Sequence, residues 1–98
     1  MYYITRENQN IFENIHINVF KESLLNIFKT WDEIILDFHE VKLNKDFTNV
    51  KVKIGFYIKG ELFLQKAIEM IVEKIDQSFI LINNARAENI KMEFLGRK

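Results

Sequence analysis

The sequence predicts an α+β domain with the element order helix, strand, strand, helix, strand. Residues 10–31 and 62–82 carry apolar side chains mostly three or four positions apart, which is the spacing of an amphipathic helix. Between them, residues 50–58 alternate strictly between apolar and polar, which is typical of a strand with one buried and one exposed face. Because these apolar faces must be buried against each other, we expect a three-stranded sheet with both helices on one face.

The first helix is expected to run from Asn10 to about Trp31. A tail precedes it at residues 1–7, and we expect residues 1–9 to be flexible. The apolar stripe of this helix consists of Phe12, Ile15, Val19, Phe20, Leu24, Ile27, Phe28 and Trp31. A stripe of this width is the face that a surface helix buries against a core.

Two strands with a polar turn between them follow. The first strand is expected at Ile34–Leu43 and the second from Asn49 or Val50 to Ile58. The turn NKDFTN, residues 44–49, contains Asn and Asp, which tolerate tight turns and hydrogen-bond nearby backbone. The alternation of the second strand points Val50, Val52, Ile54, Phe56 and Ile58 to one face and Lys51, Lys53, Tyr57 and Lys59 to the other.

The second helix is expected to begin at Glu61 or Leu62, after the helix breaker Gly60, and to end near Asn83–Asn84. Three polar residues, Asp76–Ser78, interrupt its apolar stripe, so a break in the helix is expected there. The stripe itself consists of Leu64, Ala67, Ile68, Ile71, Val72, Ile75, Phe79 and Ile82.

The last strand is expected at Asn89–Leu95, with Ile90, Met92 and Phe94 on its inner face. The inward faces of all five elements together predict one shared core. Its members are expected to include Trp31, Phe56, Ile71, Ile75 and Phe94.

The composition is that of one domain without disulfide bonds. The chain has 98 residues, 48% of them apolar, so we expect a single domain over residues 1–98. Because cysteine, a long apolar run and a signal-peptide pattern are absent, we expect a cytoplasmic monomer without membrane contact. The formal net charge is zero, although residues 1–49 carry eight acidic and five basic residues. The second half is therefore positive, which leaves room for a local basic face but argues against wrapping of duplex nucleic acid.

No pattern in the sequence matches a catalytic or metal site. A nucleophilic serine or threonine needs a neighbouring base, and none lies in a GxSxG turn. His16 and His39 are isolated and lack metal-binding spacing. The acidic residues between 32 and 40 surround an apolar triplet rather than a glycine, so we interpret them as a solvated connection. We therefore expect a protein that is not an enzyme and has no catalytic residues, no metal and no cofactor.

The lysines of the sheet are the pattern that suggests binding. Lys51, Lys53 and Lys59 share the polar face of the second strand, and Lys42 lies on the neighbouring strand. Two interpretations remain open. The lysines protect a solvated sheet from aggregation, or they contact phosphates, with Tyr57 as a stacking partner for a base. Under the second interpretation the three lysines of the second strand contribute additively and without base preference.

The hairpin sequence VKLNKDFTNVKVKI, residues 41–54, resembles the central hairpin of the ribosome-binding factor A family. That family shows an alternating strand, a Ser-x-Asp-Leu turn and the strand Ala-Lys-Val-Tyr-Val. The residues that match are Val41, Leu43, Asp46, Lys51, Val52 and Ile54. The family's Ser, Leu, Ala and Tyr are replaced by Asn44, Phe47, Val50 and Lys53. The element order also agrees over residues 11–95, which implies a type II KH-like fold with a kinked second helical segment.

Some family features are absent. The family kink is an Ala-x-Gly before a Phe, and here Asp76 and Ser78 replace the Ala and Gly while Phe79 matches. The proline before the last strand and the basic overall charge are also missing. The alkaline-shock-protein family is similar in its short strands, long amphipathic helix and final strand. It is the alternative, and it implies a protein-interaction module in envelope stress.

The first resemblance implies a ribosome assembly factor. Such a protein would bind the small (30S) ribosomal subunit late in maturation, contact the 16S rRNA precursor near its 5′ end, assist its processing and leave before translation. The residues expected to contact RNA are Lys42, Lys45, Lys51, Lys53, Tyr57, Lys59, Arg86 and Lys91. Under the alternative, the same face meets a partner protein or only water.

Overall fold

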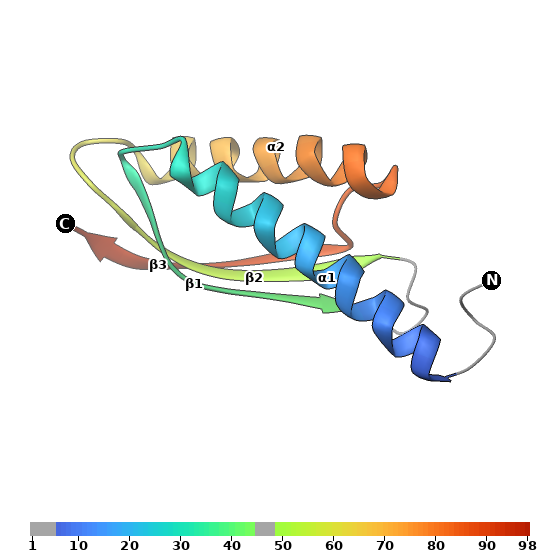
Figure 1. Cartoon of the computed structure of the whole chain (residues 1–98). Coiled ribbons are helices and arrows are strands. Elements are labelled where there is room, and N and C mark those ends of the chain that lie inside the picture. Colours follow the sequence, from blue (N-terminus) through green and yellow to red (C-terminus); the bar gives the residue numbers. More distant parts are fainter. Residues whose placement is uncertain (1–5, 45–48) are drawn as a thin grey trace.

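The computed structural model describes residues 6–44 and 49–98, with side chains from residue 17 onward. The elements are α1 (Arg6–Lys29), β1 (Ile34–Leu43), β2 (Val50–Ile58), α2 (Leu64–Asn83) and β3 (Asn89–Arg97). The predicted α+β class and element order are therefore confirmed (Figure 1). Both strands of the hairpin also have the predicted bounds.

The three strands form one mixed sheet in the order β1–β2–β3. β1 and β2 are antiparallel neighbours joined by the hairpin turn, whereas β2 and β3 are parallel. A parallel pair needs a crossover of about a dozen residues or more, and α2 supplies it. The predicted alternation of β2 is confirmed, because its buried side chains are Val50, Val52, Ile54, Phe56 and Ile58.

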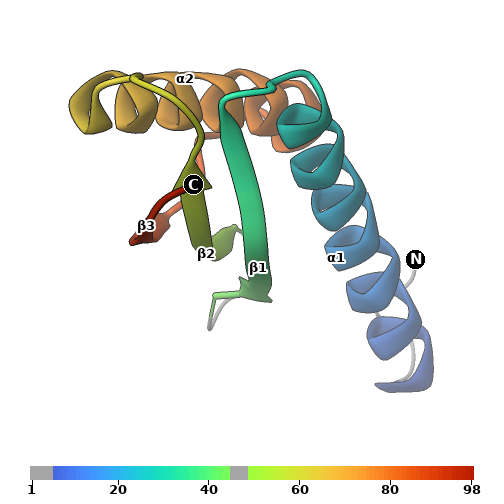
Figure 2. The same ribbon diagram turned by 90° about the vertical axis from the view of Figure 1, so that its left-hand side faces the viewer.

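The two helices pack on the inner face of the sheet. α2 lies across this face, and α1 lies beside it in contact with β1 and α2 (Figures 1 and 2). The Phe20 ring of α1 meets the Phe79 ring of α2 edge-on, with 4.7 Å between ring centroids. None of the described helices covers the opposite face, which carries Lys51 and Lys53 and is called the open face below.

The predicted core is confirmed for three of its five residues. Phe56, Ile71 and Ile75 are at most 1% exposed. Trp31 is half-buried at the margin of the core. The prediction for Phe94 is wrong: its side chain is 37% exposed, although its ring centroid lies 5.7 Å from that of Phe56. β3 is an edge strand, so the sheet covers Phe94 from one side only.

Two expectations about the helices are wrong. α1 begins at Arg6, so residues 6–9 are helical rather than part of a flexible tail. α2 runs without a break through Asp76–Ser78, so the expected kink is absent. The buried stripe continues across these polar residues from Ile75 to Phe79 in a single four-residue step, and no glycine or proline interrupts the helix.

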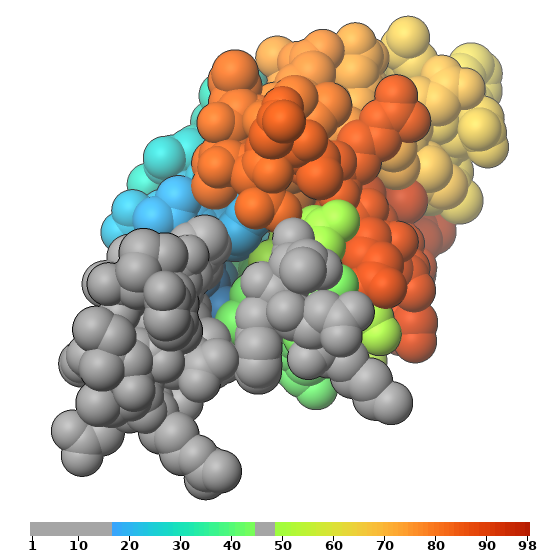
Figure 3. All heavy atoms as spheres, turned by 90° about the vertical axis from the view of Figure 1, so that its right-hand side faces the viewer, coloured from blue at the N-terminus to red at the C-terminus, as the bar shows by residue number. Residues whose placement is uncertain are grey.

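Asparagine residues lie at the ends of the hairpin strands and at the end of α2. The N–H of Asn44 donates to the carbonyl of Asn49 at 2.9 Å, and the N–H of Asn49 donates to Asn44 Oδ1 at 3.3 Å. Asn84 ends α2 in the left-handed conformation, with φ of 57°. This end of α2, orange in Figure 3, stands at the surface. The rest of the hairpin turn, residues 45–48, and residues 1–5 of the expected tail lie outside the described residues.

Candidate nucleic-acid interface

The open face brings together lysines from all three strands. On the central strand β2, Lys51 lies directly opposite Lys42 of β1. Lys53, the next outward residue of β2, lies opposite Lys91 of β3. All four side chains are exposed. Neighbouring strands are about 4.8 Å apart. Lys42 and Lys51 therefore place two like charges side by side in one row across the sheet, and Lys53 and Lys91 do so in the next row.

The same four lysines line a shallow pocket of about 330 Å³. The remaining residues of its lining are Glu40, Val52 and Asn89. Asn89 completes the row of Lys51, and Glu40 completes the row of Lys53. The pocket thus sets four cationic groups against one carboxylate, with an amide beside them that can donate a hydrogen bond. This is a lining suited to an anion.

The charges of the pocket are not balanced within the described part of the chain. Glu40 Oε1 lies 3.6 Å from Lys42 Nζ, but these side chains are 52% and 69% exposed, so the pair contributes little stability. It neutralises one lysine of the four. Like charges directly opposite each other on neighbouring strands destabilise a sheet. A bound anion that touches both rows relieves this repulsion.

An aromatic ring lies next to the pocket. Phe38 of β1 is opposite Gly55 of β2, and its ring lies over that glycine, since a Cβ at Gly55 would clash with Phe38 Cε1. A β-bulge between Leu36 and Phe38 turns Phe38 to the open face. The missing side chain at Gly55 is therefore what allows the ring to lie flat against the sheet beside the lysines.

Tyr57 lies farther along the open face, beyond Gly55. Its side chain is half-exposed, and the Nζ atom of Lys98 lies 4.5 Å from the ring centroid. This is the distance of a cation–π contact. Lys98 consequently covers one side of the Tyr57 ring, and it adds another positive charge to the open face.

The other residues expected to contact RNA lie apart from the pocket. Lys59 is exposed just after β2, six extended residues or about 20 Å from Lys53. Arg86 is exposed in the connection between α2 and β3, where its carbonyl accepts a hydrogen bond from Asn49 Nδ2 at 2.7 Å. Lys45 lies outside the described residues.

Sequence reasoning missed four residues of the open face, namely Phe38, Glu40, Asn89 and Lys98; Glu40 lies in β1 and lines the pocket rather than belonging to a solvated connection. A signal for Phe38 existed, because a glycine inside a strand often marks the close approach of another group. Gly55 occupies such a position in an otherwise strict alternation. Asn89 and Lys98 had no comparable signal, since their placement depends on the register of β3 against β2.

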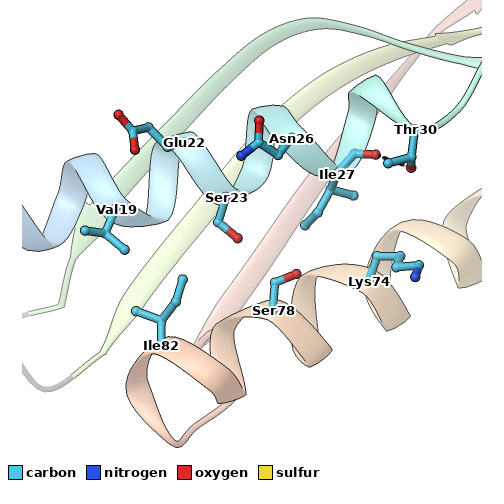
Figure 4. A pocket seen from close by; sticks show the side chains of 9 residues that line it. All are labelled: Val19, Glu22, Ser23, Asn26, Ile27, Thr30, Lys74, Ser78 and Ile82. Carbon is cyan, nitrogen blue, oxygen red and sulfur yellow. Dashed lines mark hydrogen bonds between the residues drawn. The ribbon is translucent and has the colours of Figure 1, made fainter.

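The residues first considered for catalysis or metal binding do not converge. Among the described side chains, no group of three or more His, Asp or Glu residues could hold a metal ion. His39 is half-buried, and the side chain of His16 lies outside the described residues. Ser23 and Ser78 face each other across a groove of about 450 Å³ between α1 and α2 (Figure 4). No histidine lines that groove.

No protein-family model, curated protein or solved structure matches this chain. The similarity to the ribosome-binding factor A family therefore rests on residues 41–54 and on the element order. The unbroken α2 departs from the kinked helical segment of that family. Within the described part of the chain, no helix is long and apolar enough to cross a membrane.

Proposed function

We propose that the protein binds the phosphate backbone of folded RNA with the open face of its sheet. The observation that carries this proposal is the convergence of four lysines from three strands on one pocket that has a single carboxylate. Exposed lysines contact phosphates without reading the base sequence. The function is therefore docking on RNA by charge, rather than recognition of a sequence motif.

The spacing of the lysines supports a polyanion as the ligand. Lys51 and Lys53 are two residues apart on the same face, or about 6.6 Å along β2. This is the scale of the distance between successive phosphates of one nucleic-acid strand. Lys42 and Lys91 flank them on the outer strands, so each of two phosphates can be contacted by two lysines.

The aromatic side chains extend the same surface. Along β2 the open face presents first the lysine pocket, then Phe38 over Gly55, and then Tyr57. An unpaired base can stack on such a ring, and stacking of this kind is worth about 1–3 kcal/mol per base. The surface therefore suits RNA that has both phosphates and splayed-out bases, as folded ribosomal RNA does.

The ribosomal part of the proposal comes from the hairpin resemblance, since Lys51 and Val52 are among the residues that match the family and also line the pocket. We propose that the protein is a cytoplasmic ribosome assembly factor. It binds the small (30S) subunit late in maturation and assists processing of the 16S rRNA precursor. Because α2 has no kink, the proposed contact surface is the sheet and not a helix–kink–helix surface.

Sedimentation with purified small subunits tests this function. The parent protein is expected to pellet with free subunits at low salt and to be released at high salt, because phosphate contacts release counterions. A pocket variant is expected to stay in the supernatant. It carries the substitutions Lys42→Gln, Lys51→Gln and Lys53→Gln.

A matched control removes three exposed lysines from the helices. It carries Lys29→Gln, Lys66→Gln and Lys74→Gln, and so has the same change in net charge as the pocket variant. This control is expected to pellet like the parent. Both variants should remain folded, because exposed substitutions usually change stability by less than about 0.5 kcal/mol each. A folded pocket variant that pellets like the parent contradicts the proposal.

One observation favours the alternative of a protein-interaction module. Two large apolar side chains of the α2 region are highly exposed, Phe63 at 79% and Leu81 at 88%. They lie near opposite ends of the helix and so do not form one patch, and isolated exposed apolar side chains are common on proteins. A parent protein that never pellets with subunits, at any salt concentration, would favour this alternative.

A further inference from the structure

β3 has a free edge. It is the last strand of the sheet, and no other described element lies along its outer side (Figure 2). The carbonyls of Val50 and Ile58 in β2 accept hydrogen bonds from the N–H groups of Glu88 and Lys98, which flank β3, so the even-numbered residues of β2 point their backbone groups toward β3. In a parallel pair, such a residue bonds to the two residues of the neighbouring strand that come just before and just after the residue directly opposite it. The backbone groups of Ile90, Met92 and Phe94 therefore point to the free edge.

The inner face of this edge is incompletely covered. Phe94 is 37% exposed, and Ile90 and Met92 are only partly buried against the core. These are the same three residues whose backbone groups are unpaired in the sheet. A strand added to this edge would cover more of all three side chains and would form hydrogen bonds with their backbone groups in one step.

The two charged residues that β3 carries on the open face are complementary to those of a second, antiparallel copy of β3. Lys91 and Glu93 are both exposed, two residues apart. If two copies of β3 run antiparallel with the two-fold axis at Met92, Lys91 of each copy lies opposite Glu93 of the other. On the inner face, Ile90 of each copy then lies opposite Phe94 of the other. Opposite charges and aromatic–β-branched pairs both stabilise neighbouring strands.

The neighbouring symmetric registers are unfavourable. Hydrogen bonds across this interface require the edge-facing backbone groups of the two copies, which belong to even-numbered residues, to face each other. The register can therefore shift only in steps that keep even-numbered residues opposite even-numbered residues. One such shift places Lys91 opposite Lys91, and the shift in the other direction places Glu93 opposite Glu93. Like charges directly opposite each other are destabilising. The charge pattern of β3 therefore specifies the register centred on Met92.

We propose that two copies of this chain associate through antiparallel β3 strands and form a continuous six-stranded sheet. The interface is isologous, as in most protein dimers. This inference does not depend on RNA binding. It places the two open faces on the same side of one sheet. The competing explanation is that the charged residues of β3 protect a monomer from edge pairing, and the test below distinguishes the two.

Sedimentation equilibrium over a range of protein concentrations tests the dimer. Glu93→Lys replaces two attractive pairs by two repulsive ones and is expected to weaken dimerisation by about tenfold or more. The exchange variant Lys91→Glu with Glu93→Lys restores opposite charges and is expected to dimerise within about threefold of the parent. The control Glu73→Lys makes the same charge change on the exposed side of α2 and should leave dimerisation unchanged.

Three results would overturn the proposal: a parent that stays monomeric at millimolar concentration, a Glu93→Lys variant that dimerises as tightly as the parent, or an exchange variant that does not recover dimerisation.

Disulfide cross-linking gives a second measurement, and the chain suits it because it has no cysteine of its own. In the proposed register the two Met92 residues form a hydrogen-bonded pair about 5.5 Å apart between Cα atoms, within disulfide reach. Met92→Cys should cross-link under mild oxidation, whereas Leu81→Cys, although 88% exposed before substitution, should not. Equal cross-linking of both would also contradict the interface.

Discussion

Replacement of Phe56 by alanine tests how the sheet packs against the helices. Phe56 lies in the central strand and is 1% exposed. Truncation of a buried phenylalanine loses the transfer free energy of the ring and leaves a cavity, which together cost about 3–5 kcal/mol. Domains of this size unfold with a free energy of about 5–15 kcal/mol. The variant is therefore expected to lose a large part of its stability.

Urea denaturation followed by tryptophan fluorescence is a suitable assay, because Trp31 is the single tryptophan and packs at the margin of the core. With a urea dependence of about 1–3 kcal/mol per molar, a loss of 3–5 kcal/mol lowers the midpoint by about 1 M or more. Phe63→Ala is the matched control, since Phe63 is 79% exposed and its truncation should cost less than about 0.5 kcal/mol.

An unchanged midpoint for Phe56→Ala would refute the reasoning. A one-residue slip of β2 exchanges its two faces, so Phe56 would then lie on the open face and Lys53 would be buried. The lysine pocket could not exist in that register. This stability measurement therefore also tests the geometry on which the proposed function depends.

The remaining predictions concern the open face and α2. Gly55→Ala is expected to cost about 1–3 kcal/mol by displacing the Phe38 ring, and less when Phe38 is already alanine; equal costs in both backgrounds, measured by denaturation, would show that the ring does not lie over the glycine. Because α2 is unbroken, Ser78→Gly is expected to be about 1 kcal/mol less stable than Ser78→Ala, and equal melting temperatures would indicate a break at this position. Asn84 has a φ of 57°, so Asn84→Gly should be at least as stable as the parent and Asn84→Val about 1–2 kcal/mol less stable; the reverse order of melting temperatures would contradict the left-handed cap.

Local patterns in the sequence were sufficient for the strands. The alternation of Val50–Ile58 has only one arrangement that buries the apolar side chains, so both the bounds and the exposed lysines of β2 followed from it. The break in α2 was mispredicted for a different reason. The polar residues Asp76–Ser78 fall between Ile75 and Phe79, and a helix carries them around its outer side without interrupting the buried stripe.

The composition of the pocket depends on contacts between distant parts of the chain. Lys91 meets Lys53 only because the crossover through α2 sets β3 parallel to β2 in one particular register. Phe38 reaches the open face only because of the β-bulge that precedes it. Neither the register nor the bulge has a local sequence pattern that specifies it. The grouping of Lys42, Lys51 and Lys53 was therefore predictable from the hairpin, whereas the positions of Lys91 and Phe38 beside them were not.

The salt dependence of RNA binding is the most direct test of the proposed phosphate pocket. Association constants are measured for the parent and for the variant with Lys42→Gln, Lys51→Gln and Lys53→Gln, with one folded ribosomal RNA fragment over a salt series. Each lost phosphate contact lowers the slope of log K against log salt by about 0.7–0.9, so three lost contacts should lower it by about 2–3. A folded variant with the slope and affinity of the parent would contradict the account.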